Sequence, residues 1–330
     1  METRLLGSTG IRISVLAFGA GPVPSLMTSD DGDRQRAAVR RALDVGINWF
    51  DTAATYGDGQ SEIVLGRALR GLGALGAVHI ATKVRLVPED LDMIEASVRR
   101  SVAGSLDRLG VARLTLLQLH NAITGNRGDQ PTSVTPDDVL GPGGILDAFR
   151  KLRDEGIVGH IGLTGIGHPS ALRAVLDSGQ FATMQVPYNV LNPSAGESIA
   201  RPDSEQNYGN IMADCAARGM GVLAIRVFAG GALTGQPPSR HTLRTKFFPL
   251  ALYHRHQQRC ERLRAHVDAR TDLKEVALRF VLSHPDVSAA IVGFGEPAHI
   301  DEALAFVQNG RLPSPVMADL RAWRVQDAVR

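Results

Sequence analysis

The sequence predicts an α/β protein in which eight parallel strands and their helices close into one barrel, a (β/α)8 or TIM barrel, over residues 1–330. Two observations support this fold. Short β-branched or apolar runs alternate with amphipathic stretches along the chain, which is typical of parallel strands joined by helical crossovers. The strand-then-helix step recurs eight times, and eight steps at this length fit a closed barrel better than an open sheet.

The predicted strands are short, and helical or turn-rich sequence follows each one. They lie near Val15–Phe18, Asn48–Asp51, His79–Lys83, Leu114–His120, His160–Thr164, Thr183–Pro187, Gly221–Arg226 and Ser288–Val292. Helical periodicity is clear in residues 34–46, 91–110, 143–156, 169–179 and 301–310. Several of these stretches end at a glycine, the residue that most often terminates a helix.

Some segments depart from the alternation. Residues 3–14 contain a turn at Gly7–Gly10 between two β-like runs, so we expect an N-terminal β-hairpin that closes the lower end of the barrel. Long irregular loops are expected over 121–144, 191–209 and 231–254. Each follows the C-terminal end of a strand, the face where barrel active sites form. No linker or repeat divides the chain, so one domain is expected.

Composition narrows the possible functions. Lys and Arg number 36 against 34 Asp and Glu, a balance that gives no electrostatic reason to expect nucleic acid or an anionic membrane as a partner. Two cysteines, Cys215 and Cys260, are too few for a disulfide framework and favour a reducing, cytoplasmic setting. No signal peptide or membrane-spanning run is found. A small molecule is therefore the expected partner.

Four ionisable residues are predicted to meet at the C-terminal rim of the barrel. Asp51, Lys83 and His120 end predicted strands, and Tyr56 lies in the loop after Asp51. Each has an ordinary structural explanation when taken alone, but together they suit proton transfer. A phenol, with a reference pKa of about 10, gives up its proton more readily beside an ammonium, which Asp51 would hold in place. His120 would bind a carbonyl oxygen or assist the proton transfer.

Stretches over nearly the whole chain carry a family resemblance: "GSTGIRISVLAFGA", "GINWFDTAATYGDGQSEIVLGRAL", "IATKV", "SLDRLGVARLTLLQLH", "AFRKLRDEGIVGHIGLTG", "QVPYNVLNP", "GALTG" and "AAIVGFGEPAHIDEAL". In these the sequence resembles the aldo-keto reductases. The resemblance implies hydride transfer between a nicotinamide dinucleotide and a carbonyl carbon, without a Rossmann domain. It implies that Tyr56 is the general acid, that Lys83 and Asp51 adjust its acidity, and that His120 orients the carbonyl.

The resemblance assigns cofactor contacts less completely. Gln185 matches the residue that binds the carboxamide in relatives, and Thr164 stands where a Ser is frequent, whereas Gly165 replaces a common Asn. Ile225 and Arg226 replace a Tyr-Ser pair, so aromatic stacking on the nicotinamide is lost, and Arg226 is assigned to a phosphate or the substrate. The resemblance also assigns cofactor contacts to Gly19, Phe228, Gly231, Leu233 and Phe294.

The choice of dinucleotide depends on the end of the chain. Relatives that prefer the 2'-phosphorylated form commonly place Lys and Arg where this chain has Gly293 and His299, and Asn where it has Ala303. Charge-assisted contacts to the phosphate are thereby weakened or lost. Glu302 keeps its match and is assigned to the adenine or ribose. NADP(H) is the expectation from the family, with NAD(H) a serious alternative.

Alternatives to a carbonyl reductase remain open. An NAD-dependent sugar dehydrogenase of the same family fits "GLTG" and the weak phosphate site. A cofactor-sensing subunit like the potassium-channel β subunits, a lyase and an isomerase are less favoured. The sequence determines neither the substrate nor the oligomeric state.

Neighbouring residues are expected to have structural roles. His168 should open a helix before Pro169, with a substrate contact as the alternative. Trp49 and Phe50 should lie in the core or form one wall of the pocket. The "HRH" stretch at 254–256 is not expected to bind a metal, because residues two apart on a helix point in different directions.

Overall fold

The computed structural model describes residues 1–199, 206–245, 248–267 and 271–327. Eight parallel strands form a closed barrel in the order β10-β3-β4-β5-β6-β7-β8-β9. Their bounds are β3 Leu16–Gly19, β4 Trp49–Asp51, β5 His79–Val84, β6 Leu114–Leu119, β7 Val158–Thr164, β8 Thr183–Pro187, β9 Gly221–Ile225 and β10 Val287–Gly293. The predicted TIM barrel is confirmed, and its strands lie within about two residues of their predicted bounds.

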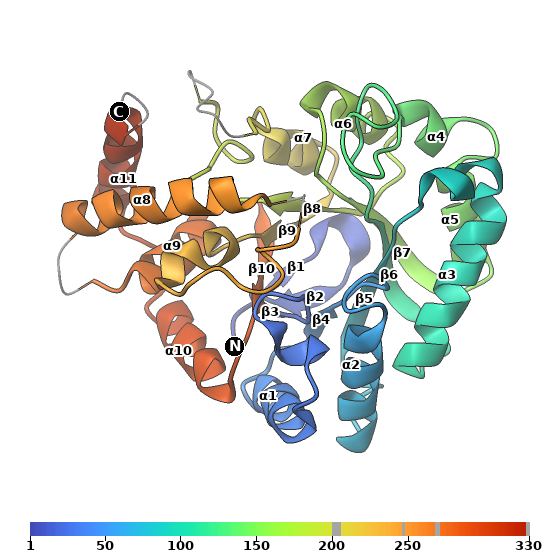
Figure 1. Cartoon of the computed structure of the whole chain (residues 1–330), viewed down its shortest axis with the longest axis horizontal. Coiled ribbons are helices and arrows are strands. Elements are labelled where there is room, and N and C mark those ends of the chain that lie inside the picture. Colours follow the sequence, from blue (N-terminus) through green and yellow to red (C-terminus); the bar gives the residue numbers. More distant parts are fainter. Residues whose placement is uncertain (200–205, 246–247, 268–270, 328–330) are drawn as a thin grey trace.

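Helices surround the strands, with α1 and α2 below, α3 and α5 on the right and α8 to α10 on the left of Figure 1. Their bounds are α1 Gly32–Asp44, α2 Gln60–Gly71, α3 Ile94–Leu109, α4 Pro136–Leu140, α5 Ile145–Asp154, α6 Pro169–Leu176, α7 Ile211–Ala217, α8 Leu250–His266, α9 Leu273–Ser283, α10 Pro297–Gln308 and α11 Ser314–Asp327. Short 3₁₀ helices are η1 Gly7–Thr9, η2 Ser25–Thr28, η3 Pro88–Asp92 and η4 Ala229–Thr234. His168 caps α6 ahead of Pro169, as predicted.

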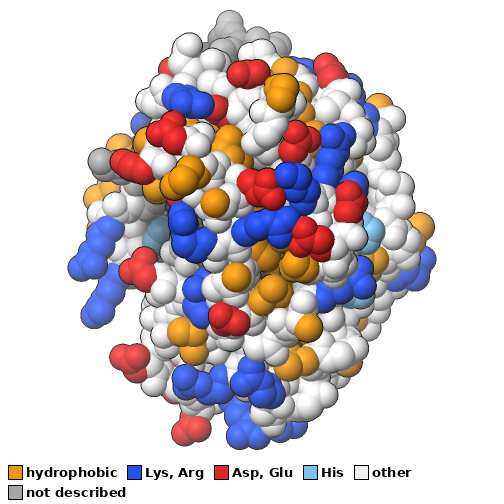
Figure 2. Space-filling model, turned by 90° about the vertical axis from the view of Figure 1, so that its right-hand side faces the viewer, with side chains coloured by type: hydrophobic (Ala, Val, Ile, Leu, Met, Phe, Trp, Pro, Cys, Tyr) orange, Lys and Arg blue, Asp and Glu red, His pale blue; other side chains and the backbone are white. Residues whose placement is uncertain are grey.

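The outer helices are tied to one another by surface ion pairs. Figure 2 shows acidic and basic side chains intermixed over the middle of the face that carries α3 and α5. Arg99 of α3 pairs with Glu95 on its own helix at 3.1 Å and with Glu155 at the end of α5 at 2.5 Å. Lys151 of α5 reaches back to Glu95 at 2.6 Å. Because water screens these ion pairs, we expect each of them to add little to the stability of the fold.

The predicted N-terminal hairpin is present. Strands β1 (Thr3–Leu5) and β2 (Arg12–Ser14) pair antiparallel around η1. Arg4 donates hydrogen bonds to the carbonyls of Leu282 and Val287, and a Cβ on Gly7 would lie 2.3 Å from the backbone nitrogen of Gly221. Because β9 and β10 begin at Gly221 and Val287, the hairpin lies at the N-terminal end of the barrel.

The interior of the barrel is filled rather than hollow. One apolar cluster lies inside the ring of strands and includes Leu6 from the hairpin segment together with Trp49, Leu116 and Leu223. A larger cluster, which contains Phe50, fills the space between the strands and the helices. Trp49 and Phe50 are both fully buried, which confirms their prediction as core residues. A polar site must therefore lie above this cluster, toward the C-terminal ends of the strands.

The long loops are partly more regular than predicted. The loop 121–144 contains α4 and is fastened by β-bridges from Ile123 to Val134 and to Gly167. The prediction that 231–254 is irregular throughout is wrong, since η4 extends into its start and α8 begins at Leu250. The prolines and aromatic residues that precede Leu250 disguise the start of this helix. In the loop 191–209, residues 200–205 lie outside the described part of the chain.

Helix α2 is held by a buried carboxylate. Glu62 is fully buried and accepts hydrogen bonds from Thr82 of β5 at 2.5 Å and from Arg108 of α3 at 2.7 Å. The helix also crosses α3 closely, because a Cβ on Gly66 would lie 2.3 Å from the carbonyl oxygen of Leu109. These contacts determine the position of the loop that precedes α2.

The close crossing gives a testable prediction. Gly66→Ala is expected to lower the free energy of unfolding by about 1–3 kcal/mol, because the added methyl group overpacks the contact between α2 and α3. Chemical denaturation measures this change. Gly71→Ala on the same helix is the matched control, because nothing lies within 4 Å of its Cβ position. It should leave stability unchanged or raise it by up to about 1 kcal/mol, and equal effects of the two variants would contradict the close crossing.

Candidate active site

The barrel brings the four predicted catalytic side chains together at its C-terminal end. Asp51 is the last residue of β4, Lys83 lies near the end of β5, and His120 directly follows β6. Tyr56 lies in the loop between β4 and α2. Its hydroxyl is 3.3 Å from Nζ of Lys83, and its ring centroid is 5.7 Å from that of His120. Residues far apart in the sequence thus form one cluster.

Lys83 and Asp51 form a buried ion pair. Nζ of Lys83 donates to Oδ1 of Asp51 at 2.5 Å and to the carbonyl of Thr52 at 2.8 Å, and only 1% of the lysine side chain is exposed. Burial by itself would lower the pKa of Lys83, but the charges of Asp51 and Tyr56 and hydrogen bonds to both raise it above its ordinary value. The ammonium therefore stays charged beside the phenol.

Two glutamines complete the surroundings of Asp51. Nε2 of Gln185 donates to Oδ2 of Asp51 at 2.5 Å, and Nε2 of Gln118 donates to the same oxygen at 3.2 Å. The carboxylate thus accepts three side-chain hydrogen bonds, which stabilise its ionised form. Sequence analysis did not identify Gln118. It precedes His120 by two residues on a strand, and this spacing is the signal that could have placed both on one face.

The loop after β4 is built to hold Tyr56. Hydroxyl groups fasten it at both ends, since Oγ of Ser61 donates to the carbonyl of Ala20 at 2.6 Å and lies 2.8 Å from Oγ1 of Thr52. The turn has left-handed backbone at Gly57 and Gly59, where φ is 58° and 90°. The Tyr56 ring also packs near Gly21, where a Cβ would lie 3.6 Å from the ring edge. The phenol is therefore fixed in front of Lys83.

His120 is held as a neutral imidazole. Burial lowers its pKa well below the ordinary value, and the charges of Arg85 and Lys83 lower it further. Nδ1 lies 3.4 Å from the hydroxyl of Thr55, and the ring meets Tyr56 edge to face. A neutral imidazole beside a phenol can orient a carbonyl oxygen by a hydrogen bond.

The predicted carboxamide residues are neighbours. Thr164, which ends β7, is paired in register with Gln185 on β8. Oγ1 of Thr164 is buried and has no hydrogen-bond partner among the described residues, and neither has Oε1 of Gln118. Gln185 is already bound to Asp51 through Nε2. This corner of the barrel therefore holds buried polar atoms that a ligand can satisfy.

The part of the predicted cofactor site that follows β9 is more apolar than the part near Thr164 and Gln185. Ile225 ends β9 and is half-buried, and Arg226 follows with φ at 56° and its guanidinium 5.1 Å from the ring centroid of Phe248. Phe228 precedes η4, and Gly231 lies within it. Leu233, also in η4, packs in the core and is 1% exposed. The predicted residues thus lie after the C-terminal end of β9, although the Leu233 side chain is buried in the apolar core.

The remaining predicted cofactor residues surround the ends of β3 and β10. Gly19 and Gly293 are paired in register, and Phe294 packs on Phe18 with ring centroids 5.6 Å apart. On α10, Glu302 forms an ion pair with Lys274 of α9. Nδ1 of His299 accepts a hydrogen bond from the nitrogen of Gly295 at 3.3 Å. The contacts of Glu302 and His299 with a dinucleotide stay predictions.

Other side chains of interest lie apart from this cluster. Cys215 and Cys260 are both free and buried. Over the described ranges of the chain, no group of His, Cys, Asp or Glu side chains is arranged to hold a metal ion. None of the helices built from described residues is long and apolar enough to span a membrane.

The chain is similar to known proteins over most of its length. The profile of the Aldo/keto reductase family matches residues 15–324. The chain is 28% identical to an L-galactose dehydrogenase of Arabidopsis thaliana over 310 residues, which cover 93% of this chain and 88% of the relative. It is 28% identical to a D-threo-aldose 1-dehydrogenase of a Pseudomonas species over 344 residues, which cover 96% of each chain.

Solved structures show the same fold. The holo form of an aldo-keto reductase from Bacillus halodurans superposes with a TM-score of 0.75 at 22% identity, over 98% of this chain and 96% of that chain. With the family profile matching most of the sequence, the chain belongs to the aldo/keto reductase family of nicotinamide-dependent oxidoreductases.

Proposed function

We propose that the protein catalyses reversible hydride transfer between a nicotinamide dinucleotide and an aldehyde or ketone, with Tyr56 as the general acid. The observation that carries this proposal is the Tyr56 hydroxyl 3.3 Å from a buried ammonium, at the open end of the barrel. Asp51 holds that ammonium in place at 2.5 Å. The arrangement suits donation of a proton to an oxygen that gains negative charge.

Each of the four residues has a defined part in this reaction. When bound, the dinucleotide supplies the hydride for the carbonyl carbon. Tyr56 donates its proton to the carbonyl oxygen as the carbon–oxygen π pair moves onto that oxygen. Lys83 stabilises the phenolate that remains, and neutral His120 orients the oxygen. In the reverse direction, Tyr56 accepts the proton of the alcohol.

The residues present fit a nicotinamide group. The unpartnered hydroxyl of Thr164 and the amide of Gln185 lie side by side and would hold the carboxamide. Neither Lys nor Arg stands at Gly293 or His299, positions that the family resemblance relates to a 2'-phosphate. We therefore infer that NAD(H) competes well with NADP(H), although the family favours the latter.

The unpartnered hydroxyl allows a direct test. Thr164→Val should weaken dinucleotide binding about 2–10-fold, because one hydrogen bond to the ligand is lost. Stability should hold or rise, since a buried unsatisfied polar atom is removed. Fluorescence titration and chemical denaturation measure the two effects. Thr183→Val is the control. The hydroxyl of Thr183 is also buried and without a hydrogen-bond partner among the described residues, but Thr183 is the first residue of β8 and lies at the opposite end of that strand from the site. Unchanged binding in Thr164→Val would reject the carboxamide assignment.

A sugar dehydrogenase is a second candidate. Two of the relatives are named L-galactose dehydrogenase and D-threo-aldose 1-dehydrogenase. The absence of Lys and Arg at Gly293 and His299 also fits a preference for NAD. In this case, the same Tyr56 would act as the base that takes the proton of a sugar hydroxyl.

One experiment tests the proposal and separates the two candidates. Purified protein is titrated with NADH and NADPH, and absorbance at the nicotinamide band is then followed with a panel of aldehydes and ketones and, for oxidation, aldoses. We expect micromolar binding of at least one dinucleotide and a dinucleotide-dependent change in absorbance. If a dinucleotide binds but none of the compounds is turned over, a cofactor-sensing role is favoured. If neither dinucleotide binds, the proposal is overturned.

A further inference from the structure

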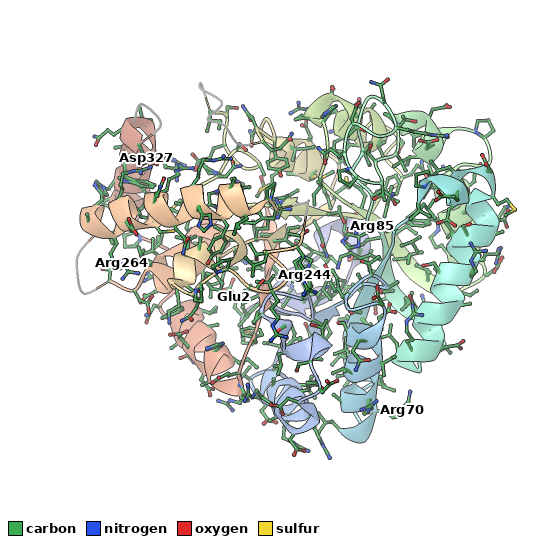
Figure 3. The ribbon with its side chains drawn as sticks, in the orientation of Figure 1. Glu2, Arg70, Arg85, Arg244, Arg264 and Asp327 are labelled. Carbon is green, nitrogen blue, oxygen red and sulfur yellow. The ribbon has the colours of Figure 1, made fainter. Side chains whose placement is uncertain are left out.

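Arg85 follows Lys83 by two residues at the end of β5. Successive side chains of a strand point to opposite faces, so residues two apart share a face. Lys83 points into the barrel toward Asp51, whereas Thr82 points outward and donates to Glu62 of α2. Because β5 ends at Val84, Arg85 is the first residue after the strand, and a continued alternation would put it on the same inner side as Lys83. Figure 3 shows it near the centre of the molecule.

The backbone on both sides of Arg85 is fixed. The nitrogen of His120 donates to the carbonyl of Val84 at 2.7 Å. The side chain of Asn121 bonds both backbone groups of Leu86, accepting from its nitrogen at 2.9 Å and donating to its carbonyl at 2.7 Å. The backbone of Arg85 is thus fixed on both sides by contacts with His120 and Asn121.

The charge of Arg85 reaches the groups around the opening. After burial, it is the largest cause of the lowered pKa of His120, and it also lowers the pKa of His241 in the segment after η4. The charge of Tyr56 in turn opposes the fall that burial causes in the pKa of Arg85 itself. Arg85 as a residue is half-buried. Its charge therefore acts both on the residues of the proposed site and on the segment after η4.

We propose that Arg85 binds an anionic group of the substrate, a carboxylate or a phosphate, while the carbonyl lies at Tyr56 and His120. This inference rests on the proposed function and names the substrate class. Lys83 cannot fill this role because Asp51 holds its ammonium at 2.5 Å, and His120 is neutral. A guanidinium presents paired donors that match a carboxylate or phosphate, and partial burial strengthens the interaction.

Matched substrates that differ only in charge test this inference. With whichever dinucleotide binds, kcat/KM is measured for 4-carboxybenzaldehyde against 4-formylbenzamide, and for glyceraldehyde 3-phosphate against glyceraldehyde. The wild-type protein should have the higher kcat/KM for the anionic member of at least one pair. A preference in the first pair indicates a carboxylate, and a preference in the second indicates a phosphate. Arg85→Met should lower kcat/KM for that anion about 10–100-fold and for its neutral partner less than about 3-fold. Arg85→Lys should recover part of the loss.

The control is Arg70→Met, which also removes one guanidinium. Arg70 ends the exposed tip of α2 and projects from the lower periphery in Figure 3, far from Arg85. It should leave both members of each pair unchanged. Equal losses for the anion and its neutral partner in Arg85→Met, or no anion preference in the wild type, would overturn the inference.

A binding measurement keeps this inference separate from the proposed function. Calorimetric titration of the wild-type protein with benzoate and with benzamide needs neither turnover nor a variant that folds well. Tighter binding of benzoate, lost in Arg85→Met, supports the inference even if no carbonyl compound is reduced. Equal binding of benzoate and benzamide to the wild type, in a protein that does reduce carbonyl compounds, would overturn the inference and leave the proposed function standing.

Discussion

Tyr56→Phe should reduce kcat for carbonyl reduction by about 10²–10⁴-fold, the contribution that a positioned general acid typically makes. The change removes only the hydroxyl 3.3 Å from Lys83 and leaves the ring against Gly21 and His120. Dinucleotide affinity should therefore stay within about 2-fold of the wild type. Steady-state kinetics and fluorescence titration measure the two quantities.

Tyr188→Phe is the matched control for this prediction. Its ring is buried and stacks on Phe280 at 5.2 Å, and its hydroxyl has no hydrogen-bond partner among the residues described. The same chemical change there should leave kcat unaltered. If Tyr56→Phe kept wild-type turnover while Tyr188→Phe behaved as expected, another group would have to donate the proton.

Lys83→Met is expected to cost both stability and turnover. It leaves the carboxylate of Asp51 buried without its cation, and breaking a buried pair in this way typically destabilises a protein by about 3–5 kcal/mol. Turnover should fall at least 10²-fold, because the phenolate loses the ammonium that stabilises it. Chemical denaturation and steady-state kinetics report the two losses.

Two further variants separate the two effects of Lys83. The double variant Asp51→Asn with Lys83→Met removes both buried charges. Most of the lost stability should therefore return, while turnover stays low. Lys151→Met removes an exposed lysine paired with Glu95 and should leave the free energy of unfolding nearly unchanged. Recovery of turnover in the double variant would show that Lys83 acts only on folding.

Much of the barrel follows from local sequence patterns. Buried parallel strands appear as short apolar runs, so β3 to β10 could be located to within about two residues. The cluster of Asp51, Tyr56, Lys83 and His120 follows once those strands are parallel, because their C-terminal ends meet on one face.

Contacts between residues far apart in the sequence could not be predicted from local sequence patterns. Gln185 was predicted as a cofactor residue, and its bond to Asp51 joins residues 134 apart in sequence, which no local pattern reports. Gln118 was missed because a single polar residue in an apolar strand has no partner that the sequence can identify. The start of α8 at Leu250 was missed because Pro249 and the preceding aromatic residues resemble loop sequence.

The apolar cluster beneath Asp51 has a consequence for how protons move. Leu6, Trp49, Leu116 and Leu223 fill the interior of the barrel beneath Asp51, so the cylinder is closed at that end by packed side chains. In the described part of the chain, solvent and reactants would then both reach Lys83 from the C-terminal side of the barrel. If Tyr56 is the proton donor, as proposed, a molecule bound there would also block the route by which the phenol regains its proton.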